Sequence, residues 1–234
     1  MPQHRRLSPF LALLLLAGCA AAPAGRDPVS GSEPANLGVL KRELVAYHDG
    51  GAYERDIAAV ASRAAAWIEE RAGKVARPAL VLDIDETSIS NWPQMRVNDF
   101  GYFKSGPCDL EKGPCGALAW EDMGRGEPIR PVLDLYRKAR ALGVAVFFVT
   151  GRQEAQRAGT ERNLRAAGYE GWEGVVLRPE GPRQPTAEYK SGARAAIEAK
   201  GYTIVANVGD QDTDLAGGHA EKGFKLPNPF YWIP

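Results

Sequence analysis

Two carboxylates that directly follow an apolar run are the residues of this sequence best suited to chemistry. Asp83 and Asp85 come after residues 79–82, a short apolar run typical of a buried strand. In an open parallel sheet, the ligand crevice lies outside the carboxyl ends of the strands. Acids placed there project into a site rather than into the core. We therefore expect this stretch to carry the chemistry of the protein.

Polar residues also gather at later positions that such a sheet would bring to the same edge. They are Thr150 with Arg152, Lys190, and Asp210 with Asp214. Each has an ordinary alternative role, because Asp is a common helix cap and Thr-Gly a common loop sequence. Several carboxylates that converge would repel one another, so the site needs a cation. Oxygen ligands without His or Cys favour Mg²⁺.

The elements that must position these residues alternate along the second half of the chain. Helical runs at 131–142, 154–167 and 186–200 are separated by β-rich runs at 144–149, 174–177 and 203–208. This alternation indicates repeated βαβ units and a parallel sheet covered on both faces. We predict an α/β fold, a Rossmann-like doubly wound parallel sheet, within a domain of residues 37–234.

Residues 88–126, between the first strand and this alternation, are rich in aromatic residues, Gly and Pro. An irregular segment of this length is either functional or disordered, and its aromatic content argues against disorder. We predict a small, mainly helical cap beside the strand ends, built from about 88–126 together with N-terminal helices at 37–47 and 53–71. The aromatic rings could either line a site or form the cap's own small core.

The first residues have the pattern of a targeting segment. A basic start precedes the apolar run 10–17, which is too short to span a bilayer, and the run ends in Leu-Ala-Gly-Cys at 16–19. This ending resembles a bacterial lipobox, which implies a signal peptide at 1–18, a lipid on Cys19 and a tether at 19–36. The alternative is an ordinary secretory signal with an incidental Cys. Residue 20 is Ala rather than Asp, which by resemblance to lipoprotein sorting rules implies the outer membrane of a bacterial cell envelope, with the body in the periplasm or at the surface.

Two cysteines remain, Cys108 and Cys115, and in an oxidising envelope they are free to pair. The spacing alone does not decide between a disulfide and two thiols, because it does not show how closely their Cα atoms approach. A zinc site at these cysteines is disfavoured because no His lies nearby.

The charges of the chain balance, because Lys+Arg and Asp+Glu number 29 each. This composition offers no polybasic footprint for nucleic acid.

Four motifs resemble those of the haloacid dehalogenase (HAD) superfamily. They are Asp-Ile-Asp-Glu-Thr at 83–87, Thr-Gly-Arg at 150–152, Lys190, and Gly-Asp-Gln-Asp-Thr-Asp at 209–214. Together with the tail Phe-Lys-Leu-Pro-Asn-Pro-Phe-Tyr at 224–231, they look closest to class B (subfamily IIIB) acid phosphatases. That group includes bacterial outer-membrane lipoprotein phosphatases and plant vegetative storage proteins. The resemblance covers roughly residue 37 to the C-terminus.

The resemblance implies a mechanism through an aspartyl-phosphate. Asp83 would attack phosphorus, which splits a difficult hydrolysis into two steps. Asp85 would protonate the leaving alkoxide and later deprotonate water, which requires a carboxyl pKa raised by acidic neighbours. Thr150 and Lys190 would hold the phosphoryl oxygens, with Gly151 and Arg152 beside them. Arg152 would either contact the substrate or pair with a surface acid.

The resemblance also implies Mg²⁺ and a phosphomonoester substrate. The metal ligands would come from Asp83, Asp85, Asp210 and Asp214, with Asp214 supporting either Lys190 or the waters of the metal. Stacking on Trp92, Trp120, Phe230 or Tyr231 would suit nucleoside monophosphates such as 5'-nucleotides. The alternatives are a non-catalytic surface or storage lipoprotein on a phosphatase scaffold, or a phosphotransferase or dehalogenase of the same superfamily. The oligomeric state stays open, a homodimer included.

Overall fold

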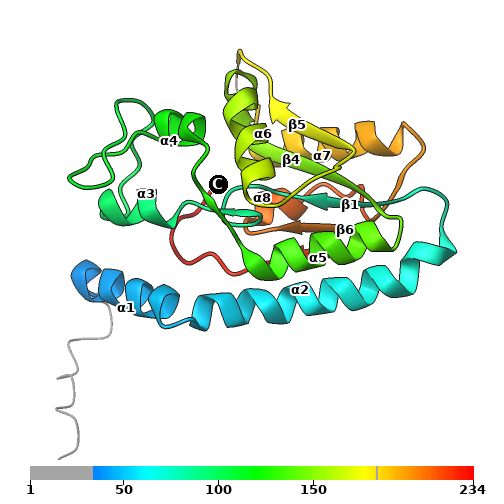
Figure 1. Ribbon diagram of the computed structural model, residues 1–234, viewed down its shortest axis with the longest axis horizontal. Helices are drawn as coiled ribbons and strands as arrows, with labels where there is room; N and C mark the ends of the chain where they lie inside the picture. The colour runs from blue at the N-terminus through cyan, green and yellow to red at the C-terminus, as the bar shows by residue number, and fades with distance from the viewer. Residues whose placement is uncertain (1–33, 183) are drawn as a thin grey trace, which may run out of the picture. The chain divides into compact units, whose positions relative to one another are not determined.

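A five-stranded parallel sheet in the order β5-β4-β1-β6-β7 organises the structure, a computed structural model (Figure 1). Its strands are β1 (Pro78–Leu82), β4 (Ala145–Gln153), β5 (Gly174–Arg178), β6 (Thr203–Gly209) and β7 (Gly223–Lys225). β1 lies between β4 and β6, and every pairing is parallel. The predicted parallel α/β fold is confirmed. Edge strand β7 was not predicted, because three residues are too few to give a periodic signal.

The structure describes residues 34–182 and 184–234, of which Leu37–Pro234 form one compact unit. The predicted signal peptide, Cys19 and nearly all of the tether lie outside the described residues. No helix within the described ranges is long and apolar enough to cross a membrane.

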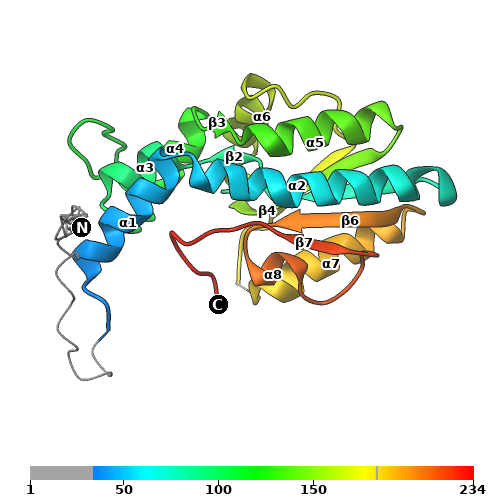
Figure 2. The same cartoon turned by 90° about the horizontal axis from the view of Figure 1, so that it is seen from below.

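Successive side chains of a strand point to opposite faces of the sheet, and in β1 both sets are apolar, so helices cover both faces. Leu80 and Leu82 of β1 pack into one core cluster, and Ala79 and Val81 pack into another. The first face carries α2 (Ala52–Arg71), α5 (Arg130–Ala141) and α6 (Arg157–Ala166), and the second carries α7 (Thr186–Glu198) and the short α8 (Asp212–Leu215). Figure 2 shows α2 and α5 on the side of the sheet opposite α7 and α8.

The cap consists of two short helices joined by a long loop, with a small antiparallel sheet at its base. Its elements are β2 (Ile89–Ser90), α3 (Trp92–Val97), α4 (Ala117–Met123) and β3 (Glu127–Pro128). Helix α1 (Leu37–Asp49) contacts the cap, where Lys41 Nζ lies 2.6 Å from Asp99 Oδ2. Helix α2 was predicted to belong to the cap, and this was wrong. Its buried residues, such as Ile57 and Ile68, pack against the sheet and α5 instead.

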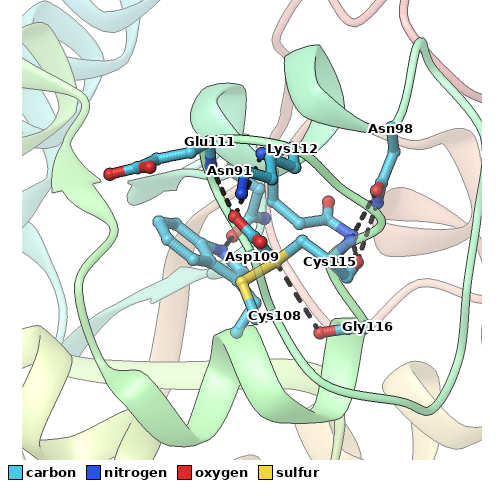
Figure 3. The surroundings of a disulfide bond; sticks show 10 residues. Asn91, Asn98, Cys108, Asp109, Glu111, Lys112, Cys115 and Gly116 are labelled. Carbon is cyan, nitrogen blue, oxygen red and sulfur yellow. Dashed lines mark hydrogen bonds between the residues drawn. A yellow bond between two sulfur atoms is a disulfide. The ribbon is translucent and has the colours of Figure 1, made fainter.

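A disulfide between Cys108 and Cys115 closes the loop of the cap (Figure 3). This settles the alternative that the spacing had left open. Cys115 is fully buried, and its backbone is bonded on both sides by the Asn98 side chain, at 2.7 Å from its N–H and 2.8 Å from its carbonyl. Gln94 Nε2 donates to the same carbonyl at 3.2 Å. The disulfide therefore fixes the loop against α3, which carries one wall of the site described next.

Candidate active site

The centre of the site is a buried cluster of Asp83, Lys190 and Asp214. Asp83 follows the central strand, and its backbone N–H still donates to Val208 of β6 at 3.0 Å. Lys190 Nζ, from α7, lies 2.5 Å from Asp83 Oδ1 and also donates to Asp214. The hydrogen bonds among described side chains engage only Oδ1 of the Asp83 carboxylate. Burial raises the pKa of Asp83, and Lys190 opposes that rise.

The loop after β6 is held so that Asp210 and Asp214 face this cluster. Asp210 accepts hydrogen bonds from Thr87, Gln211 and Asn228 at 2.7 to 2.9 Å. Asp214 Oδ2 accepts from the backbone N–H of Gln211 at 2.8 Å, which forms a capping box at the start of α8. The buried Arg194 donates to three backbone carbonyls of the same loop, those of Asp214, Ala216 and Gly218. These bonds fix both carboxylates before any ligand arrives.

Three of the four predicted metal ligands form a group that suits one cation. Oxygens of Asp83, Asp210 and Asp214 lie within 4.8 Å of one another, and all three residues are buried. Lys190 forms ion pairs with Asp83 and Asp214, so it compensates one of the three negative charges that the group carries when all three carboxylates are ionised. Burying net charge is costly unless it is neutralised, and carboxylate oxygens are hard ligands. The residues present therefore fit a divalent cation.

Asp85 differs from its predicted state. Its carboxylate pairs with Arg152, whose Nη2 lies 2.7 Å and whose Nε lies 3.1 and 3.2 Å from its oxygens. Burial acts to raise the pKa of Asp85, but the charge and hydrogen bonds of Arg152, together with the Asn91 hydrogen bond and the charge of Lys190, outweigh it and lower the pKa. The prediction of a raised pKa was wrong because it counted only acidic neighbours. Of the two alternatives for Arg152, pairing with a surface acid is wrong, because its partner Asp85 belongs to the site.

A cavity of about 650 Å³ opens above these residues, between the strand ends, the cap and the C-terminal tail. Asp83, Asp85, Lys190, Gly151 and Arg152 all line it, as do Asp210 and Asp214. Thr150 is fully buried beneath, where its hydroxyl accepts a hydrogen bond from the backbone N–H of Arg152 at 3.1 Å. Its contact with phosphoryl oxygens stays a prediction.

The predicted aromatic contacts divide into two groups. Trp120 and Tyr231 line the cavity, as does Phe230. Trp92 does not line it, contrary to the prediction. Its ring stacks on His48 of α1, with centroids 3.7 Å apart and planes 14° apart, and its Nε1 donates to Asp49 at 3.0 Å. Sequence distance hid this contact, because only the packing of α1 against the cap brings His48 to Trp92.

Several further cavity residues were missed by the sequence reasoning, among them Glu86, Glu121 and Trp232. Glu86 is buried and accepts a hydrogen bond from Tyr231 Oη at 2.9 Å. Burial and the charge of Asp85 raise the pKa of Glu86 to about 8. Glu121 lies on the cap helix α4, and Trp232 lies in the tail with 75% of its surface exposed. Only Glu86 had a sequence signal, since it stands inside the first motif.

The fold and site define a class of protein, and a family comparison identifies that class. The model of the HAD superfamily, subfamily IIIB (Acid phosphatase), matches residues 39–234. The chain therefore belongs to subfamily IIIB of the HAD superfamily, the acid phosphatases.

Plant proteins are among the similar sequences. Acid phosphatase 1 of Solanum lycopersicum is 34% identical over 190 residues, which are 80% of this chain and 72% of the tomato protein. The stem 28 kDa glycoprotein of Glycine max is 36% identical over 161 residues, 67% of this chain and 61% of that protein. Vegetative storage protein 1 of Arabidopsis thaliana is 33% identical over 66% of this chain, although the match spans only 55% of its length.

Solved structures agree with the fold. The class C acid phosphatase from Bacillus anthracis superposes with a TM-score of 0.65 at 19% identity, covering 84% of this chain and 86% of that one. The same enzyme has also been solved with tungstate bound, where the TM-score is 0.63 at 18% identity, over 83% of this chain and 86% of that one. At this level of identity the likeness concerns the fold alone.

Proposed function

We propose that this protein is a Mg²⁺-dependent acid phosphatase that hydrolyses phosphomonoesters through a phosphoryl group on Asp83. The observation that carries the proposal is the buried group of Asp83, Asp210 and Asp214 around Lys190, at the floor of the cavity. Membership of the acid phosphatase subfamily supports it, as does tungstate, a tetrahedral oxyanion, in the Bacillus anthracis enzyme.

In the first step, Asp83 attacks the phosphorus atom. Lys190 holds Oδ1, so Oδ2 is the oxygen available for the new bond to phosphorus. The bond from phosphorus to the ester oxygen breaks, and the departing alkoxide takes a proton from Asp85, which lines the same cavity. Lys190 also neutralises charge on the phosphoryl oxygens, and such charge cancellation is the main source of catalysis in phosphoryl transfer.

In the second step, water attacks the phosphoryl group and releases inorganic phosphate and free Asp83. Asp85 then acts as a base and removes a proton from that water. Its pairing with Arg152 favours the ionised carboxylate, which is the form this step needs. For the first step, the proton must reach Asp85 against the influence of Arg152. The bound phosphate dianion supplies negative charge that competes for this arginine.

Asp83, Asp210 and Asp214 would hold the Mg²⁺ ion, together with the backbone carbonyl of Asp85. When bound, the ion supplies positive charge that offsets the repulsion between the carboxylates and the phosphate dianion. Asp214 also bonds Lys190 and the Gln211 N–H, so it would position Lys190 as well as contribute to the metal site.

A chromogenic phosphate ester tests the proposal. Wild type should turn it over with Mg²⁺ and stop with chelator, and Asp83→Asn should lose at least about 10³-fold in kcat, as losses of a catalytic nucleophile do. Asp134→Asn, an exposed acid on α5 outside the cavity lining, is the matched control and should be unaffected. No turnover in any condition would favour the non-catalytic storage role that the plant relatives suggest. Transfer of phosphate to an alcohol rather than water would favour a phosphotransferase.

Nucleoside monophosphates fit the aromatic lining of the cavity, where a base could stack. Trp232 replaces Trp92 as the ring to test, because it lines the cavity and is largely exposed. A base-aromatic stack contributes about 1 to 3 kcal/mol, so Trp232→Ala should lower the ratio of 5'-AMP to glycerol phosphate turnover about fivefold or more. Trp172→Ala, which removes a ring outside the cavity lining, is the control. An unchanged ratio in Trp232→Ala would rule out stacking on this ring.

The lipobox-like sequence also supports a lipid anchor on Cys19 that tethers the enzyme to a bacterial outer membrane. The similar sequences named above come from plants, so the proposed anchor depends on the leader sequence alone. In a bacterial host, labelled fatty acid should be incorporated by wild type and not by Cys19→Ser. Release of an unlabelled, soluble wild-type protein would favour the ordinary secretory signal.

A further inference from the structure

The cap carboxylate of Glu121 has no role in the mechanism above, although it lines the cavity. Its Oε2 atom is buried and has no hydrogen-bond partner in the part of the chain that the structure describes. An unpaired buried carboxylate oxygen is costly, and such groups in native proteins are usually satisfied by a ligand or water. Protonation would not remove the need, since a carboxylic acid O–H also requires a partner.

The backbone that carries Glu121 is held rigidly. Its carbonyl lies against Gly159 of α6, where an added Cβ would come within 2.6 Å of the oxygen. The preceding residue, Trp120, is buried and donates from its indole N–H to Asn91 Oδ1 at 2.7 Å. Asn91 in turn donates to Asp85 Oδ1 at 2.9 Å. A chain of direct contacts thus fixes the cap helix, and Glu121 with it, relative to Asp85.

Glu121 and Asp85 line the same cavity, and the contacts through Trp120 and Asn91 connect the helix of Glu121 directly to Asp85. The charges of Asp85 and Arg152 both act on its carboxyl group. In an in-line displacement the leaving oxygen departs on the side of phosphorus opposite to Asp83, and Asp85 must reach that oxygen to protonate it. A group beside Asp85 on the cap therefore faces the first atoms of the leaving alcohol.

We propose that Glu121 is a specificity residue that accepts hydrogen bonds from hydroxyl groups of the leaving alcohol, so that polyol and sugar phosphates are preferred over alkyl phosphates. A site built to bond a substrate hydroxyl rejects the analogue that lacks it, because its own polar group is then left unpaired. This inference depends on the proposed phosphatase function and extends it to the substrate class.

The test compares kcat/KM for ribitol 5-phosphate and n-pentyl phosphate, which have the same chain length and differ in their hydroxyl groups. Wild type should prefer ribitol 5-phosphate, and Glu121→Met, which keeps the length of the side chain without its oxygens, should reduce that preference at least about tenfold. Glu121→Gln keeps one acceptor oxygen and should lose less. Asp122→Asn, at the exposed neighbour outside the cavity lining, is the matched control and should keep the wild-type ratio.

An unchanged ratio in Glu121→Met would overturn the inference. If Glu121→Met fails to fold, an unchanged ratio in Glu121→Ala, which also lacks both acceptor oxygens, overturns it as well. A chromogenic aryl phosphate, which has no aliphatic hydroxyl, tests the phosphatase activity separately from the role of Glu121. Turnover of the aryl ester with no preference for ribitol 5-phosphate in wild type would remove the role of Glu121 and keep the phosphatase. Failure to hydrolyse any of the three esters would overturn the proposed function itself.

Discussion

Breaking the pair of Asp85 and Arg152 should reveal a strong coupling between the two residues. The Arg152 side chain is only 1% exposed and the Asp85 side chain 27%, and three contacts of 2.7 to 3.2 Å join them. Removing one partner of a buried pair costs about 3 to 5 kcal/mol, because it leaves an uncompensated charge. Since Asp85 keeps some solvent contact, we expect about 3 kcal/mol for Arg152→Met and a coupling energy of about 2 kcal/mol with Asp85→Asn.

The assay is a double-mutant cycle of urea unfolding, followed by tryptophan fluorescence in the presence of chelator. The cycle subtracts the separate bonds of Arg152 to Thr160 and of Asn91 to Asp85. The exposed pair of Lys138 and Glu69, 2.6 Å apart, provides a control cycle and should give less than about 1 kcal/mol. A coupling for Asp85 and Arg152 no larger than that of the control pair would refute the argument that burial makes this pair strong.

Three further predictions follow from the site and the cap. Glu86 has a raised pKa of about 8 in the folded protein, whereas the unfolded chain loses this proton near pH 4.5. The protonated Glu86 therefore contributes fully to the free energy of unfolding below pH 4.5, and this contribution is lost as the pH rises to about 8. With chelator present, the free energy of unfolding of wild type should therefore fall relative to Glu86→Gln by about 1 kcal/mol per pH unit between pH 5 and 8, and parallel curves would contradict this. Mg²⁺ at 100 times its Kd should stabilise wild type by about 2.7 kcal/mol, measured by thermal unfolding, and should stabilise Asp210→Asn far less. If Mg²⁺ stabilised both proteins equally, Asp210 would not belong to the metal site. The double variant Cys108→Ser/Cys115→Ser should lower the free energy of unfolding by about 2 kcal/mol, because the disulfide closes a loop with a sequence separation of seven. The comparison with wild type is made in urea without reductant. An unchanged free energy of unfolding would mean that the loop does not depend on the disulfide.

The strand ends were predictable because they depend on local pattern and on one rule of topology. Asp83 and Asp210 each follow an apolar run, and parallel strands must bring the residues after such runs to one edge. Lys190 was expected at the same edge from its place in the chain, its role came from the family resemblance, and the structure puts its Nζ 2.5 Å from Asp83 Oδ1. When short apolar strands alternate with helices along the chain, few sheet topologies other than a parallel sheet covered by helices are available.

The cap could not be worked out to the same degree, because its contacts join residues from unrelated elements. Trp92 was assigned to the substrate by ring type and position, yet the ring of His48, on a separate helix, occupies its face. Arg152 was expected to contact the substrate or to pair with a surface acid, whereas the fold buries it against Asp85 inside the site. Glu121 carries no motif at all, and only the placement of α4 over the strand ends brings it to the cavity.

Trapping the covalent intermediate tests the central claim most directly. A phosphomonoester labelled with ³²P, mixed with the protein and Mg²⁺ and quenched in acid, should leave label on the protein. Reduction with borohydride and mass spectrometry should then locate the phosphorylated carboxyl at Asp83, and Asp83→Asn should carry no label. Rapid turnover with no labelled protein, or label on a residue other than Asp83, would contradict the account.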